Sequence, residues 1–420
     1  MVTQVVSVFT LLVLLLWGIK RPAFLLAGTF FTYQVGAISG LDWIGSVYVA
    51  AAGGIALVRF AIRPVATRLM LGDFAMILLT VFLIASSFWA PYPDDAFAMA
   101  LQLLLSVAGM YLIARLEPGD AQFFRDFVLA LAIAGAVLAI CLLAVRVVDG
   151  VHQGTRLYIT NESASTVGIS MALPYVLVAG FVLLFFARKP SQMSIGAVSL
   201  AVTGYCSVIS ATRSVFLAFG VGALIFAFLA RRSLHMSRKT ANIFAGVLLL
   251  PVAIAMVPDG AFENLLSRFS GGVSGVASQR ERQQLWADGW SIISEHPFIG
   301  GGYGSFDQYS TTSYPHNMLI EITAAGGVIG LGLLLFWLAV TAAHLLRSYR
   351  VRPVPAAFLI GLFLAATASM QVSFAFFMAR PLFLISALAA AWASQVPQGR
   401  RLPARRFHPV GGRHIVGGRG

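Results

Sequence analysis

The chain has 420 residues, of which 59% are hydrophobic and 11% charged, and its formal net charge is +13. Soluble globular proteins are about 45–50% apolar and about 25% charged, so this composition excludes that class and indicates a polytopic membrane protein. Apolar runs long enough to cross roughly 30 Å of hydrocarbon recur along the sequence, without the alternation typical of barrel strands. We therefore expect an all-α bundle of about 12 transmembrane helices.

Predicted spans are separated by short connectors that differ in charge. Basic clusters follow the spans that end near residues 60, 114, 187, 230 and 344, and basic-poor connectors alternate with them. The positive-inside rule places the basic connectors in the cytoplasm. The same clusters account for the net charge, so we expect no nucleic-acid partner. The spans are predicted near 4–19, 22–38, 43–60, 72–89, 97–114, 123–147, 163–187, 194–210, 214–230, 240–257, 316–344, 355–376 and 380–396.

This pattern divides the chain into four regions. Residues 1–257 form N-terminal transmembrane helices, 258–315 a long loop on the outer, periplasm-like side, 316–397 C-terminal transmembrane helices, and 398–420 a cytoplasmic tail. The tail has six arginines and no acid, which favours contact with anionic lipid headgroups. The outer loop is longer than a connector needs to be, and so it is expected to carry catalytic and substrate-binding elements.

His316 is the candidate catalytic residue. Pro315 is suited to a first helical turn, and His316 and Asn317 follow it at the start of a predicted span on the outer side. The imidazole would stand where a lipid-borne substrate presents its head group, and histidine is the usual general base for a hydroxyl proton. The same position also suits an interfacial histidine that only bonds a neighbour. Glu321 is the only acid in that span, and we expect it to orient or charge-balance an arginine rather than to react.

Three arginines are candidates for binding an anionic group. Arg213 begins a span on the outer face, against the positive-inside tendency, and Arg280 and Arg282 precede an amphipathic stretch, residues 285–293. That stretch predicts a helix lying in the membrane interface. A planar guanidinium binds two phosphate oxygens at once, so several convergent arginines suggest a diphosphate ligand. Each arginine alone could instead be an interfacial anchor. The expected apolar face of this helix consists of Leu285, Trp286, Trp290 and Ile293.

The glycines at 300, 301, 302 and 304 predict a tight turn. No strand precedes them and no P-loop lysine follows, so a nucleotide loop is not indicated. The turn would fold the end of the interfacial helix back toward the His316 helix. On the outer face the sequence offers no metal-ligand spacing, and its one close acid pair is Asp94–Asp95. We expect a reaction without metal or other cofactor.

Together these residues resemble the Wzy_C/O-antigen ligase superfamily over about 50 residues. The motifs are Arg282-x-x-x-Trp286, His296-Pro297-Phe298-Ile299-Gly300-x-Gly302-x-Gly304-x-Phe306, His316-Asn317-x-Leu319-x-Glu321, and the glycine pattern from Gly326 to Leu331. Gly301 replaces the apolar residue that is common in the middle of the family's glycine turn. Thr212-Arg213-Ser214 also resembles the family's pattern.

The resemblance to the lipopolysaccharide O-antigen ligases of this superfamily implies a glycosyltransferase of the bacterial inner membrane. Glycan would pass from undecaprenyl diphosphate to the lipid A core on the periplasmic face, without metal or nucleotide. By the same resemblance His316 would be the general base, and Arg213 and Arg282 would hold the donor diphosphate, with Arg280 a less certain neighbour. Asn317, Glu321 and Trp286 would support the site. One base and a departing diphosphate would suit inversion at the anomeric carbon.

Other activities stay open at this stage. The superfamily also contains Wzy-type polymerases and protein O-oligosaccharyltransferases; the absence of a large soluble outer domain favours a ligase over the latter. A polymerase would use similar residues on two lipid-linked glycans. A transporter of lipid-linked substrates is a hypothesis of another class, but it predicts internal repeats, which the sequence lacks.

Overall fold

The computed structural model describes residues 2–41, 43–62, 68–116, 121–148, 170–187, 189–210, 212–231, 273–310, 312, 314–372 and 375–395. Within these residues the regular structure is helical, with fourteen α-helices. Eight helices are long and apolar enough to cross a membrane, and shorter apolar helices accompany them. The prediction of an all-helical polytopic membrane protein is confirmed. The predicted span at 240–257 and the tail at 398–420 lie outside the described residues.

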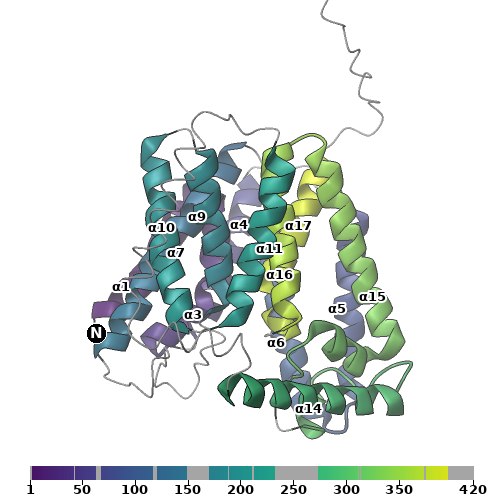
Figure 1. The fold of residues 1–420 in the computed structure, drawn as a ribbon. Coiled ribbons are helices and arrows are strands. Elements are labelled where there is room, and N and C mark those ends of the chain that lie inside the picture. Colours follow the sequence, from purple (N-terminus) through teal and green to yellow (C-terminus); the bar gives the residue numbers. More distant parts are fainter. Residues whose placement is uncertain are drawn as a thin grey trace, which may run out of the picture.

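Most helices run along one bundle axis, while α14 lies across one end of the bundle (Figure 1). The helices are α1 (Val2–Lys20), α2 (Pro22–Thr29), α3 (Thr32–Ser39), α4 (Ile44–Ile62), α5 (Leu71–Ser86), α6 (Pro93–Arg115), α7 (Ala121–Val148), α9 (Leu173–Phe186), α10 (Pro190–Ser210), α11 (Arg213–Ala230), α14 (Val273–Glu295), α15 (Met318–Tyr349), α16 (Pro353–Met370) and α17 (Arg380–Ser394). We call the end covered by α14 the α14 end of the bundle.

The interior of the bundle is formed by helices that are apolar on every side. Every residue of α17 from Pro381 to Ala393 is buried, whereas α1, α4 and α5 leave large apolar side chains exposed, as membrane-facing helices do. Close approach of α11 and α16 depends on small residues. A Cβ added at Gly361 would come within 2.7 Å of the Gly222 carbonyl oxygen, so the two backbones touch where both side chains are missing.

The predicted span at 22–38 is not one helix. It consists of two eight-residue helices, α2 and α3, which meet at Phe30–Phe31. Two threonines border the break, and their hydroxyls donate to main-chain carbonyls: Thr29 to Leu26 at 2.6 Å and Thr32 to Thr29 at 3.2 Å. Such local bonds compete with regular helix formation, and hydropathy does not register them.

Helix α15 is interrupted near its start, at Gly327, whose φ of 60° and ψ of −157° are not helical. The first part, Met318–Gly326, is therefore a short helix that begins at the α14 end, and the longer part continues to Tyr349. A break within an apolar helix leaves main-chain groups that need other partners, because lipid offers none. The loop that follows α14 supplies them.

Candidate functional site

The segment from Pro297 to Gly302 fills the break in α15 by main-chain pairing. Gly301 and Gly302 donate their N–H groups to the carbonyls of Ala324 and Ala325, at 2.8 and 3.0 Å. In return, Val328 donates to the Pro297 carbonyl at 2.8 Å. The loop thus provides hydrogen-bond partners for main-chain groups on both sides of the break. The glycine turn folds back onto the His316 helix as predicted, and it is held there by main-chain bonds.

Glycine is required in this turn because the chains touch. Gly300, Gly302 and Gly304 have φ values of 70°, 98° and 85°. A Cβ at Gly300 would lie 2.4 Å from the Ala325 carbonyl carbon, and one at Gly302 would lie 2.7 Å from the Ser86 carbonyl oxygen. Neither position can hold a larger residue without moving backbone. The turn therefore fixes α14 and α15 to the connection between α5 and α6.

A second set of contacts joins this loop to α5 and α6. Tyr303 donates its N–H to the Ser86 hydroxyl at 2.9 Å, and the Trp89 indole donates to the Gly300 carbonyl at 3.2 Å. The Tyr92 N–H donates to the Gln308 side-chain oxygen at 3.2 Å. The chain just before Asp94–Asp95 and the described part of the long loop, 297–310, therefore lie on one side of the protein, as the sequence predicts for the acid pair and the loop.

Helix α14 is amphipathic, but its buried face differs from the predicted one. Leu285, Gly289 and Ile292 are buried, at a spacing of four and three residues, while Trp290 is 59% exposed. Gly289 marks the closest approach: a Cβ there would lie 2.4 Å from the Ile320 side chain. The small residue brings α14 onto the start of α15, which rotates the buried stripe away from Trp290. An exposed tryptophan on a helix that crosses the bundle end suits a membrane interface.

His316 lies before the helix, contrary to the prediction that it is part of the first turn. Helix α15 begins at Met318 with Asn317 as its N-cap, and His316 has a φ of 55°, the only non-glycine positive φ among the described residues. This left-handed conformation is costly for a residue with a Cβ and indicates that its surroundings hold it. The imidazole is half-buried and meets the Tyr314 ring edge-on, with centroids 4.5 Å apart.

Neighbouring residues fix the chain on both sides of His316. The Trp286 indole donates to the Pro315 carbonyl at 3.1 Å, so α14 holds the preceding residue. Asn317 accepts from the Ile320 N–H at 3.1 Å and donates to the Gln371 carbonyl at 3.2 Å, which joins the helix start to the end of α16. Trp286 and Asn317 thus support His316 through the backbone.

Glu321 has a different partner from the predicted arginine. It is buried, and both carboxylate oxygens accept from the Phe376 N–H, at 3.0 and 2.9 Å. Phe376 belongs to the turn between α16 and α17, so the carboxylate ties three helices together. In the part of the chain that the structure describes, Glu321 forms no ion pair. The carboxylate therefore holds a main-chain N–H and not an arginine, and a supporting role in catalysis stays a prediction.

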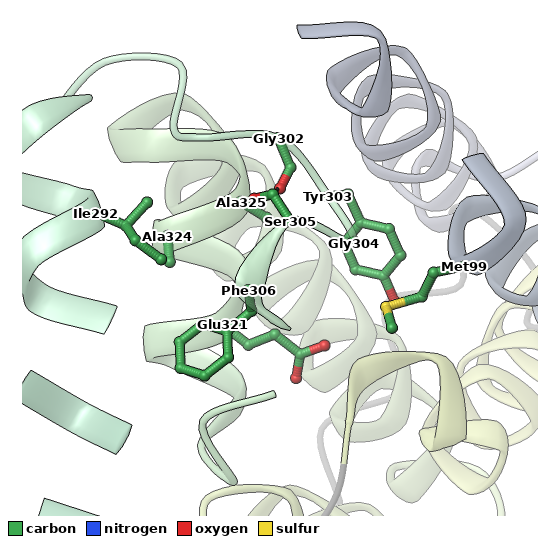
Figure 2. Close-up of a pocket in the computed structure, with 10 residues that line it drawn as sticks. All are labelled: Met99, Ile292, Gly302, Tyr303, Gly304, Ser305, Phe306, Glu321, Ala324 and Ala325. Carbon is green, nitrogen blue, oxygen red and sulfur yellow. Dashed lines mark hydrogen bonds between the residues drawn. The ribbon is translucent and has the colours of Figure 1, made fainter. Parts of the chain in front are cut away.

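Glu321 and Tyr303 both point into a small cavity of about 10 Å³ (Figure 2). The Tyr303 phenol is fully buried, and burial, reinforced by the charge of Glu321, raises its pKa well above the ordinary value. Tyr314 is also kept as a neutral phenol, because burial, then Glu321 and then Tyr33 raise its pKa to about 12. A cavity of this size holds about one water and no substrate, so it belongs to the scaffold under the site.

The candidate arginines differ in their placement. Arg282 is half-buried on α14, one turn before Trp286, and Arg280 is exposed on the same helix. Arg213 is the first residue of α11, and its side chain lies outside the described part. The last turn of α11 is at the opposite end of the bundle, where Tyr349 donates to the Leu229 carbonyl at 2.7 Å. Arg213 therefore starts α11 toward the α14 end, the end at which His316 precedes α15.

One residue near this site was absent from the sequence prediction. Arg380 begins α17, and its guanidinium donates to the Thr32 hydroxyl at 2.7 Å. It carries the signal that identified Arg213, an arginine at the start of an apolar span, and it lies toward the same end of the bundle. Among the described residues no group of three or more His, Cys, Asp and Glu side chains gathers as a metal site would, and metal independence stays a prediction.

The helices, the broken α15 and the helix across the bundle end define this chain as a polytopic helical membrane protein with one elaborated end. Residues 198–335 match the Wzy_C family, described as O-antigen ligase. The chain therefore carries an O-antigen ligase family domain. A protein of Pseudomonas aeruginosa called O-antigen ligase is 36% identical over 83 residues, which cover 19% of this chain and 20% of that protein. The matched family interval contains Arg213, Arg282 and His316.

Proposed function

We propose that this protein is an O-antigen ligase, which transfers glycan from undecaprenyl diphosphate to the sugar of a lipid A core. The α14 end of the bundle would face the periplasm, and the bacterial inner membrane would hold the helices. Membership of the Wzy_C family supports lipid-linked glycans as substrates. The charge pattern of the connectors supports the orientation.

One contact carries the proposal: the Trp286 indole bonds to the Pro315 carbonyl at 3.1 Å. It joins the helix that bears Arg282 directly to the segment that bears His316. A glycosyl transfer needs a base near the acceptor hydroxyl and cations near the departing diphosphate, and a direct bond between the two segments that bear them supports a shared site. The start of α15 adds the positive end of a helix dipole beside them.

The chemistry follows from those positions. The imidazole of His316 takes the proton of the acceptor hydroxyl as its oxygen attacks the anomeric carbon. The bond from that carbon to the diphosphate oxygen breaks, and undecaprenyl diphosphate leaves with the electron pair. Arg282 and Arg213, with Arg280 nearby, hold the leaving anion, so it needs no proton. A single displacement inverts the anomeric configuration.

The test is transfer by purified protein in detergent, with lipid-linked glycan as donor and lipid A core as acceptor. A core that gains glycan of inverted configuration is the expected result. Chain growth when lipid-linked glycan is the only acceptor would move the assignment to a Wzy-type polymerase, and transfer to a protein would move it to an O-oligosaccharyltransferase. Movement of the donor across a bilayer without bond formation would overturn all three in favour of a transporter.

A further inference from the structure

A second, larger cavity lies beside the candidate site, between the broken α2–α3 region and the start of α17. Its volume is about 200 Å³. Its polar lining residues are Arg380, Thr32, Tyr33 and Ser46. Gly36 and Gly45 also line it, and a Cβ added at Gly45 would lie 3.2 Å from the Thr32 side chain. Ordinary ligand pockets measure about 300–1,000 Å³, so this cavity suits one small charged group and a single sugar.

Arg380 is the charged residue in the described lining of this cavity. In the described residues Arg380 bonds to the neutral Thr32 hydroxyl and forms no ion pair. A guanidinium inside an apolar bundle is costly unless an anion meets it, and such a residue is a functional candidate by default. The break between α2 and α3 places Thr32 at a helix start, where its hydroxyl reaches the cavity. A guanidinium and the hydroxyl-bearing residues of this lining suit a phosphate, whose oxygens accept several hydrogen bonds.

The cavity is connected to His316 through two tyrosines. Tyr33 lines the cavity and contributes, after burial and Glu321, to the raised pKa of Tyr314, and the Tyr314 and His316 ring centroids are 4.5 Å apart. On the other side of the same segment, Trp286 bonds to Pro315 and leads to Arg282. The His316 segment is therefore held to α14 by Trp286 and, through the bond from Asn317 to the Gln371 carbonyl, to the connection between α16 and α17.

We propose that the Arg380 cavity binds a phosphate group on a sugar of the acceptor glycan, and so helps to select the acceptor. This inference rests on the proposed function. Transfer requires two substrates on opposite sides of the base. The arginines of α14 are next to the segment that precedes His316 and serve the donor diphosphate, which leaves the α17 side for the acceptor. The cavity is too small for a glycan chain, as expected for a subsite that recognises one phosphorylated sugar.

The experiment compares native protein with Arg380→Gln and Arg380→Lys. Arg231→Gln is the matched control, because Arg231 is exposed at the far end of α11, over the Phe228 ring. Each protein is given phosphorylated lipid A core and the same core after chemical dephosphorylation. The native chain and the control should have a KM about 10–100-fold lower for the phosphorylated core than for the dephosphorylated core, because only the phosphorylated core makes the charge-assisted contact. Arg380→Gln should lose this preference with kcat and donor KM unchanged, and Arg380→Lys should keep part of it.

Equal loss of transfer with both cores, or a raised donor KM, would overturn the acceptor assignment. A binding measurement separates this failure from failure of the proposed function. Mannose 6-phosphate should raise the melting temperature of the purified native protein and of Arg231→Gln, but not of Arg380→Gln, and mannose should raise none. If native protein transfers no glycan yet shows this pattern, the proposed function fails and the phosphate site stands. No stabilisation by mannose 6-phosphate would overturn the site itself.

Discussion

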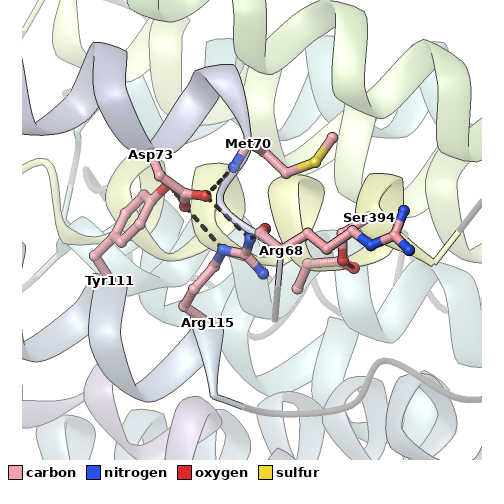
Figure 3. Close-up of polar contacts among 7 residues, drawn as sticks. Arg68, Met70, Asp73, Tyr111, Arg115 and Ser394 are labelled. Atoms are coloured by element: carbon pink, nitrogen blue, oxygen red, sulfur yellow. Dashed lines mark hydrogen bonds and ion pairs between the residues drawn. The ribbon is translucent and has the colours of Figure 1, made fainter. Parts of the chain in front are cut away.

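The two ends of the bundle differ in the partners of their charged side chains. At the end opposite α14, the Asp73 carboxylate is buried and fully occupied: Arg115 bonds to both of its oxygens at 2.8 and 3.0 Å, and Tyr111 donates at 2.6 Å (Figure 3). The Met70 N–H adds a fourth bond at 2.6 Å. At the α14 end, Arg380 has only a neutral partner in the described residues, and Arg280 is exposed.

This difference distinguishes the Asp73 cluster, which is structural, from the candidate functional site at the α14 end. Around Asp73, protein groups satisfy the buried charge and hold the start of α5 against the end of α6. At the α14 end, main-chain bonds hold the loops in place. The arginine candidates lie at the same end as His316, whose left-handed backbone is strained. Substitutions of charged side chains at the two ends should therefore affect different quantities, stability at the Asp73 end and transfer at the α14 end.

The largest loss of transfer among these variants is expected at Gly327, where main-chain bonds hold the loop in the break of α15. A Cβ at Gly327 would lie 2.3 Å from the Phe298 carbonyl, so Gly327→Ala should expel the loop from the break in α15. We expect stability to fall by about 2 kcal/mol or more and transfer to be lost. Gly332→Ala in the same helix is the control, because a Cβ there meets nothing within 4 Å. Thermal unfolding and the transfer assay measure both, and a Gly327→Ala protein as stable as the control would contradict the role of the loop.

Arg282→Gln should have the next largest effect. Loss of a charge-assisted bond to the donor diphosphate costs about 1.5–3 kcal/mol, a decrease in kcat/KM for the donor of about 10–150-fold. Arg280→Gln should change it less than about threefold, because an exposed cation is screened by solvent. Steady-state kinetics at varied donor concentration measure both. A larger effect at Arg280 would reverse their assignment.

A smaller effect is expected for Trp286→Phe. The phenylalanine keeps most of the ring but cannot donate to the Pro315 carbonyl, a loss of about 0.5–1.5 kcal/mol and so about 2–10-fold in kcat. Trp290→Phe is the control, since that side chain is exposed on the same helix. Equal kcat values for the two variants would show that the indole contact does not position His316.

Asp73→Asn should leave transfer almost unchanged and still reduce stability. It removes the charge that Arg115 meets inside the bundle, which for a buried pair costs about 3–5 kcal/mol. The folded fraction should transfer glycan within about twofold of native protein, because Asp73 and the α14 site are at opposite ends of α5. A changed donor or acceptor KM would contradict the separation of the two ends.

Hydropathy was sufficient to predict the architecture because lipid allows few alternatives. Apolar runs located most spans within a few residues, and the amphipathic stretch located α14. Hydropathy could not predict the breaks at Phe30–Phe31 and Gly327, because the residues there are apolar or small and only tertiary partners make a break tolerable. The rotated face of α14 depends on Gly289, whose packing against Ile320 no periodicity encodes.

The roles of the site residues stay predictions. His316 and Asn317 are adjacent in the sequence and so in space, whereas Trp286 bonds to Pro315 across 29 residues, a contact that only the fold creates. The partner of Glu321 is 55 residues away along the chain, and a main-chain N–H leaves no mark in the sequence. Arg380 was missed although an arginine at the outer end of an apolar span was a usable signal.

The central claim is that the imidazole of His316 deprotonates the acceptor in a glycan transfer at the α14 end. The most direct measurement is single-turnover transfer from undecaprenyl diphosphate-linked glycan to lipid A core by native protein, His316→Asn and His296→Gln. Asparagine tolerates the left-handed backbone of residue 316, and His296 is exposed, so both variants should fold. We predict a rate about 10²–10⁴-fold lower for His316→Asn alone. A His316→Asn rate within threefold of native protein would contradict the claim.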